Sequence, residues 1–99
     1  YLETARRLGL RLAVASSSRH AWVEGHLRQL GLLELFDAIL CHEDVRQIKP
    51  DPELFLAALQ ALQIPAAQAL AFEDSRNGVL AARGAGLAEF WVTPINKSS

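Results

Sequence analysis

Residues 70–78 read LAFEDSRNG, and in them a short apolar run ends abruptly in two adjacent acids, Glu73 and Asp74. This pattern is typical of a buried strand that presents charge at its carboxyl end. In an open parallel sheet, ligands bind beyond the carboxyl ends of the strands. Carboxylates are the hard oxygen ligands that Mg²⁺ takes, so the two acids predict a cation or phosphate site. The alternative is a solvated loop in which Ser75 caps the helix that follows.

Length and composition indicate one small domain of ordinary composition. The chain has 99 residues, of which 51% are hydrophobic and 21% are charged, and its formal net charge is -1. This balance lacks the basic excess of a nucleic-acid-binding protein. No apolar run reaches the roughly 20 residues that span a bilayer. The first residues also lack the apolar segment of a signal peptide, so we expect a cytoplasmic protein without nucleic-acid or membrane partners.

The single cysteine and the three histidines show no recognisable metal-ligand spacing. Cys41 ends the apolar run at residues 38–41, so it is expected to be a small buried side chain, and a reactive thiol is the alternative. His20 and His26 are six positions apart on a predicted helix. They therefore point about 240° apart around it and cannot share a metal ion.

Short apolar runs alternate with helical patterns along the whole chain. Strands are expected at four runs: residues 12–15, 38–41, 69–72 and 90–92. Apolar residues recur at helical spacing in four segments: residues 2–8, 19–30, 52–62 and 76–85. Asp51 is expected to cap the third helix, with Pro52 as its first residue. Strands that alternate with helices of about ten residues form parallel βαβ units with right-handed crossovers, so we expect an α/β fold.

Two further polar motifs fall at the carboxyl edge of the predicted sheet. Ser16, Ser17 and Ser18 end a strand and precede a helix, where hydroxyls and free backbone N–H groups suit a phosphate. Simple helix capping is the alternative for these serines. Lys49 is held stiffly by Pro50 and is a good point charge for an anion. A surface lysine in a proline-rich turn is the alternative here.

These motifs resemble those of the haloacid dehalogenase-like (HAD) hydrolases, within the branch that contains beta-phosphoglucomutase and phosphoglycolate phosphatase. Residues 15–18 resemble the second motif of that family, residues 49–55 the third, and residues 72–75 with Gly78 the fourth. The three motifs have the order and spacing of the family, and the resemblance covers nearly the whole chain. It implies a Rossmann-like three-layer sandwich around a parallel sheet.

The resemblance also implies roles for the candidate site residues. Ser16 would hold a phosphate oxygen, and Lys49 would bridge the phosphate and the nucleophile. Asp74 with Glu73 would hold Mg²⁺. Further phosphate contacts are expected from the residues that follow Ser16: Ser17, Ser18 and Arg19.

Two parts of the family pattern are missing from these residues. The Asp-x-Asp-Gly-Thr segment of the first strand, whose first aspartate attacks phosphorus, does not occur, and Asp37 and Asp44 do not match it. The cap between the first and second motifs is missing too. Residues 1–99 are therefore expected to be the C-terminal part of a HAD-like core domain, the portion after the cap.

The missing first strand belongs in the middle of the family's sheet, in the spatial order five, four, one, two, three. Residues 12–15 and 69–72 would flank it. We expect these two strands either to pair with a strand from an N-terminal segment or another chain, or to close up against each other. If residues 38–41 lay between them instead, the family topology would be wrong for this chain.

The expected function is that of a phosphatase of a small phosphorylated metabolite, acting through an aspartyl-phosphate. Because the nucleophile lies outside these residues, the 99 residues alone are expected to be inactive. A phosphomutase of the same family is one alternative, since the choice depends on the cap. The other alternative is a catalytically inactive module that binds phosphate or Mg²⁺, or that serves in protein interaction.

Overall fold

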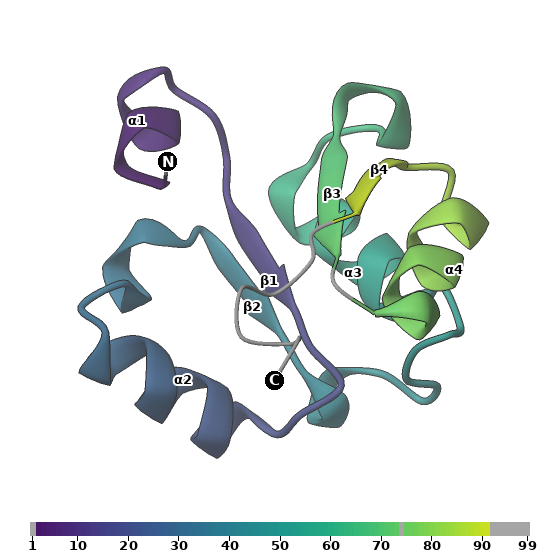
Figure 1. Ribbon diagram of the computed structural model, residues 1–99, viewed down its shortest axis with the longest axis horizontal. Helices are drawn as coiled ribbons and strands as arrows, with labels where there is room; N and C mark the ends of the chain where they lie inside the picture. Colours follow the sequence, from purple (N-terminus) through teal and green to yellow (C-terminus); the bar gives the residue numbers. More distant parts are fainter. Residues whose placement is uncertain (1, 74, 92–99) are drawn as a thin grey trace, which may run out of the picture.

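The computed structural model describes residues 2–73 and 75–91, in which strands and helices alternate (Figure 1). The strands are β1 (Ala13–Ala15), β2 (Ala38–Leu40), β3 (Leu70–Glu73) and β4 (Ala88–Trp91). The α-helices are α1 (Leu2–Arg7), α2 (His20–Gln29), α3 (Glu53–Leu62) and α4 (Arg76–Gly84). Three 3₁₀ turns lie between them: η1 (Leu33–Leu35), η2 (His42–Asp44) and η3 (Ala66–Gln68). None of these helices is long and apolar enough to cross a bilayer.

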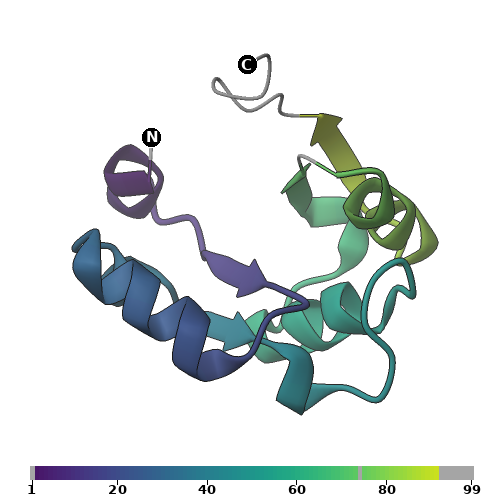
Figure 2. The same ribbon diagram turned by 60° about the horizontal axis from the view of Figure 1, so that its bottom comes forward.

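The four strands form two separate parallel pairs. β1 pairs with β2 along its whole length, and β3 pairs with β4 in the same way. Figures 1 and 2 show the two pairs on opposite sides of the molecule. Within residues 2–73 and 75–91, no ladder of backbone hydrogen bonds joins β1 to β3, and β2 does not pair with β3. The predicted α/β class with parallel strands is confirmed.

The two pairs agree with the predicted spatial order, with a gap where the first strand would lie. The expectation that residues 12–15 and 69–72 might close up against each other is wrong. The reason is the helix layer beneath them: α3 packs on β1 and β2 and also contacts α4, which packs on β3 and β4. This layer holds the two pairs apart.

The largest buried cluster lies where α3, α4 and β3 meet. Its members are apolar side chains with at most 8% exposure: Phe55, Leu59, Ala71, Ala81, Ala82, Ala85 and Leu87. The small side chains of α4 let it approach α3 closely. At Gly84, for example, an added Cβ would lie 3.2 Å from Cβ of Pro52. The core therefore sits under the strand ends that carry the candidate site.

The strands that flank the gap are less covered than the apolar runs predicted. All three residues of β1 are only half-buried. In β3, Ala71 and Glu73 are buried, whereas Leu70 and Phe72 are 54% and 65% exposed. The expectation of a buried strand is therefore wrong for one face of β3, because the described residues supply a helix layer for the other face only.

Several boundaries differ from the predicted ones. The N-cap of α2 is Arg19 and makes no side-chain cap bond, so none of the three serines caps this helix. α3 begins at Glu53, whose N–H donates to Oδ1 of Asp51 at 3.0 Å, so the capping acid lies one position further out than expected. The fourth strand starts before residues 90–92, and Val92 lies outside the described residues.

Asp37 fastens the beginning of the β1–β2 pair to the first helix. Its Oδ2 accepts a hydrogen bond from the N–H of Leu12 at 2.8 Å, and Nη1 of Arg6 lies 2.7 Å from its Oδ1. The bond from Leu12, and then the guanidinium of Arg6, hold the pKa of this carboxyl below its usual range. The ionised form of Asp37 is therefore favoured in the folded chain.

A pH-dependent loss of stability is expected from this contact. A lowered folded-state pKa stabilises the fold above the unfolded pKa of about 3.9, and that stabilisation is lost as the pH falls through the folded value. Asp37→Asn should therefore lower the unfolding midpoint at neutral pH, and the difference from the parent should shrink below about pH 4. Urea unfolding at several pH values measures it. Glu34→Gln, at an exposed acid of η1 without an ion pair in the described residues, is the control. A difference that is constant with pH would contradict the assignment.

Candidate functional site

Lys49 is the centre of the candidate site. Its Nζ donates to the carbonyl oxygen of Ala15 at 2.7 Å and to Oε2 of Glu73 at 2.8 Å, and it lies 4.9 Å from the ring centroid of Phe55. The side chains of Lys49 and Glu73 are 12% and 9% exposed. One lysine thus links the carboxyl ends of β1 and β3 across the gap, and it is not the surface lysine of the alternative interpretation.

The loop before α3 positions Lys49. The Lys49–Pro50 peptide bond is cis, and the chain then turns directly into α3. Glu53, at the start of α3, accepts hydrogen bonds from the backbone N–H groups of Arg46 and Gln47, both at 3.0 Å. The loop is therefore fastened to the helix on the approach to Lys49.

Glu73 reaches the site through a space left by Gly78. An ideal Cβ at Gly78 would lie 1.7 Å from Oε1 of Glu73 and 2.3 Å from its Cδ. The hydroxyl of Ser75 accepts a hydrogen bond from the N–H of Gly78 at 3.0 Å and caps α4, which the alternative interpretation of this stretch had included. The absence of a side chain at Gly78 is what lets the buried carboxylate of Glu73 lie against the first turn of α4.

The serine loop continues directly from β1. The N–H of Ser16 donates to the carbonyl oxygen of Leu40 at 2.9 Å, and its Oγ accepts from the N–H of Ser18 at 3.1 Å. Because Ser16 follows the residue whose carbonyl holds Lys49, these two predicted site residues converge on one strand end. The other three predicted phosphate contacts lie further along the loop: half-buried Ser17, exposed Ser18 and exposed Arg19.

Of the two predicted Mg²⁺ ligands, the structure describes Glu73. Asp74 lies outside the described residues. One oxygen of Glu73 is occupied by Lys49, but a carboxylate offers about four lone-pair positions. A hard oxygen donor at a strand end, with acceptor positions left, fits a Mg²⁺ ligand.

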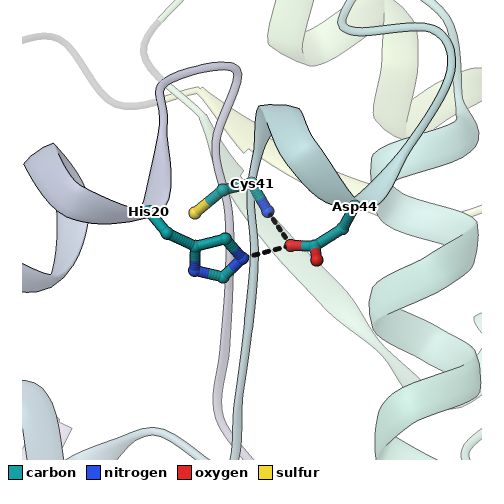
Figure 3. Close-up of side chains that lie close together, drawn as sticks. All are labelled: His20, Cys41 and Asp44. Carbon is teal, nitrogen blue, oxygen red and sulfur yellow. Dashed lines mark hydrogen bonds and ion pairs between the residues drawn. The ribbon is translucent and has the colours of Figure 1, made fainter.

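Sequence reasoning did not find a second group of side chains, which lies where α2 begins and β2 ends (Figure 3). Oδ2 of Asp44 lies 2.5 Å from Nε2 of His20 and accepts from the N–H of Cys41 at 2.8 Å. Cys41 is fully buried, as predicted, and burial raises the pKa of its thiol to about 11. Local spacing could not reveal the whole group, because His20 lies 24 positions before Asp44, although Cys41 and Asp44 are only three positions apart.

Comparison with known proteins identifies the family. The family described as haloacid dehalogenase-like hydrolase matches residues 1–86 of this chain. The chain belongs to the haloacid dehalogenase-like hydrolases, and the resemblance seen in the three motifs is confirmed.

Individual relatives agree with this assignment. The chain is 49% identical over 87 residues to YhcW of Bacillus subtilis, covering 88% of the chain and 40% of YhcW. It is 34% identical over 90 residues to the phosphorylated carbohydrates phosphatase of Thermotoga maritima, covering 91% of the chain and 42% of that protein. The chain thus spans about 40% of the length of the curated relatives it matches.

The fold is also similar to solved structures. CbbY from Rhodobacter sphaeroides in complex with phosphate superposes with a TM-score of 0.90 at 38% identity, over 95% of this chain and 43% of CbbY. A variant of the same CbbY was crystallised with xylulose-(1,5)bisphosphate and superposes with a TM-score of 0.89. The high structural similarity confirms that the two strand pairs have the HAD-like arrangement.

Proposed function

We propose that residues 1–99 are the part of a phosphatase core domain that follows the cap, and that the whole enzyme hydrolyses small phosphorylated metabolites. The observation that carries this proposal is the position of Lys49. An ammonium group has three donors, and Ala15 and Glu73 use two of them. Among residues 2–73 and 75–91 the third has no hydrogen-bond acceptor, which supports a phosphate oxygen as its partner where the strand ends meet. The names of the Thermotoga maritima relative and of the CbbY complexes support a phosphorylated sugar or a similar metabolite as substrate.

In this proposal the chain supplies charge and positioning. In phosphoryl transfer, the protein mainly orients the phosphate and neutralises its equatorial oxygens. Lys49 supplies one positive charge, and the hydroxyl of Ser16 binds a phosphate oxygen. Additional phosphate contacts come from the rest of the loop: Ser17, Ser18 and Arg19. An aspartate from outside these residues forms the bond to phosphorus as the bond to the leaving oxygen breaks, and water then releases phosphate.

The first strand, supplied by an N-terminal segment or another chain, fills the gap between β1 and β3 in this proposal. The exposed Leu70 and Phe72 on β3 support the idea that further chain covers this region. The expected cytoplasmic location and the assignment of residues 1–99 to one C-terminal part of a domain stay predictions.

Mg²⁺ is the proposed cofactor, held by Asp74 and Glu73, and when bound it would neutralise further charge on the phosphate. Asp74→Asn is expected to weaken Mg²⁺ binding more than Glu73→Gln, because Glu73 already shares its carboxylate with Lys49 and the aspartate is the more general ligand in the resembled family. Titration calorimetry on the full-length protein measures both affinities. Equal or reversed losses would refute this ranking.

The function is tested with the polypeptide that also contains the first strand and the cap. It is assayed for phosphate release from p-nitrophenyl phosphate and from a panel of sugar phosphates. We expect release that is abolished when the first aspartate of its Asp-x-Asp-Gly-Thr segment is changed to asparagine. Conversion of a sugar phosphate without net phosphate release would identify a mutase instead. Binding of phosphate or Mg²⁺ without turnover would contradict the proposal that the whole protein is an enzyme. The lack of such a segment in the natural protein would contradict it as well.

A further inference from the structure

The side chains of His20, Cys41 and Asp44 meet at a place away from the Lys49 site. His20 is the first residue of α2, Cys41 follows β2, and Asp44 ends η2. Their ligand atoms, an imidazole nitrogen, Sγ and a carboxylate oxygen, all lie within 4.8 Å of one another. In Figure 3 the sulfur of Cys41 and the carboxylate of Asp44 both lie beside the imidazole ring. Three different donor types thus converge, one from the start of α2 and two from residues 41–44.

The three donor types of this group match the ligands that zinc takes in proteins. Zn²⁺ binds cysteine sulfur, histidine nitrogen and aspartate oxygen, whereas Mg²⁺ takes oxygen ligands almost alone. From Zn–N distances of about 2.0–2.1 Å and Zn–S of about 2.3 Å, the donors of a tetrahedral site lie roughly 3.5 Å apart. The observed separations differ from that value by roughly 1 Å, a change that side-chain movement can supply.

His20 is oriented for such a role by a fourth residue. Nδ1 of His20 lies 2.7 Å from Oε2 of Glu24, on the next turn of α2. A histidine that binds a metal ion usually donates its other ring N–H to a carboxylate, which selects the tautomer with a free lone pair on the metal side. Nε2, the other ring nitrogen, faces Asp44. In the tautomer in which Nδ1 donates to Glu24, Nε2 carries the lone pair that would bind the ion.

The electrostatic surroundings favour a cation. The carboxylates of Glu24 and Asp44 lie against the His20 ring, and Glu43 accepts a hydrogen bond from the backbone N–H of His20 at 2.9 Å. Two carboxylates therefore contact the imidazole, a third lies at the backbone of the same residue, and Arg19 is the neighbouring cation on the α2 side.

We propose that His20, Cys41 and Asp44 form a zinc-binding site, with water completing the coordination and Glu24 as a positioning residue. Binding releases the proton of the Cys41 thiol and any proton on Nε2, and the thiolate and carboxylate together balance the two positive charges of the ion. Such a site would pin the start of α2, and with it the serine loop, to the end of β2.

The test uses the full-length protein, purified without a polyhistidine tag, stripped with a chelator and titrated with ZnCl₂ in the presence of excess Mg²⁺. We expect one Zn²⁺ per chain. His20→Gln and Cys41→Ala should each weaken binding by at least about 100-fold, and Glu24→Gln by about 10–100-fold, the usual effect of losing an outer partner. His26→Gln, at an exposed histidine of the same helix, should leave the affinity within about twofold of the parent.

Co²⁺ gives an independent readout, because it replaces Zn²⁺ and a cysteine thiolate adds an intense near-ultraviolet absorption that oxygen and nitrogen ligands do not. This measurement needs only the parent protein, so it stands even if Cys41→Ala does not fold. Absence of the thiolate band, or Zn²⁺ binding that is unchanged in His20→Gln, would overturn the proposal. Loss of the band in His26→Gln alone would assign the ion to another site and overturn it as well.

Discussion

Lys49→Met is expected to reduce turnover of the complete enzyme by about 10²–10³-fold, the usual cost of losing one preorganised donor. It is also expected to destabilise the fold, because Glu73 is 9% exposed and would lose its cationic partner. Removing one member of a buried ion pair costs about 3 kcal/mol or more. Steady-state kinetics and urea unfolding of the same preparation measure the two effects.

The double variant Lys49→Met with Glu73→Gln separates them. Replacing both members of a buried pair with neutral groups is close to neutral for stability, so the double variant should recover most of the unfolding free energy while turnover stays low. Arg46→Met removes one positive charge from the same exposed loop and should change neither. If the double variant regained turnover together with stability, Lys49 would be a structural residue only.

Gly78→Ala is expected to lower turnover although Gly78 itself has no side chain in the site. The new Cβ would overlap Oε1 of Glu73 at 1.7 Å, so the carboxylate has to move away and its bond to Lys49 is lost. Displacement of a catalytic group by about 1 Å costs about 10²-fold in rate. Overpacking a buried position also costs about 1–3 kcal/mol of stability, which exceeds the gain of about 0.5–1 kcal/mol from alanine in a helix.

Gly25→Ala provides a matched comparison on α2. No atom lies within 4 Å of a Cβ built at Gly25, so this substitution should raise stability by about 0.5–1 kcal/mol and leave turnover unchanged. Thermal unfolding and kinetics on the two variants give the contrast. Similar gains of stability in both would mean that Glu73 has room to move, and that the space at Gly78 does not position the carboxylate.

The convergence of Lys49 with β1 and β3 could be predicted because it follows from patterns that are local in sequence, whereas the strand order was implied by the resemblance to the family. A short apolar run followed by a polar group marks a strand end, and parallel strands bring such ends to one edge. The partner of Lys49 could not be predicted in this way. Glu73 was expected at the metal ion, but burial of both side chains favours direct pairing in the described structure.

Other features were out of reach because tertiary contacts decide them. Whether one or both faces of β3 are covered depends on the layers that surround the strand. The apolar sequence of the strand does not distinguish these two cases. The group at His20 and Asp44 depends on how α2 meets η2, a turn of three residues without helical periodicity. Capping of α2 by a serine, the alternative interpretation of this loop, does not occur: Arg19 is the N-cap, and Oγ of Ser16 bonds within its own loop.

The gap between β1 and β3 also sets an order of events during synthesis. A central strand encoded before β1 would need two neighbours, and β3 is made after β1 with about 55 residues between them, roughly 3–11 s of translation at 5–20 residues per second. With such a strand, the nascent chain would carry an unpaired strand edge until β3 leaves the ribosome, the kind of surface that nucleates aggregation and that chaperones cover. We therefore expect this stretch of the chain to be the one most sensitive to translation speed.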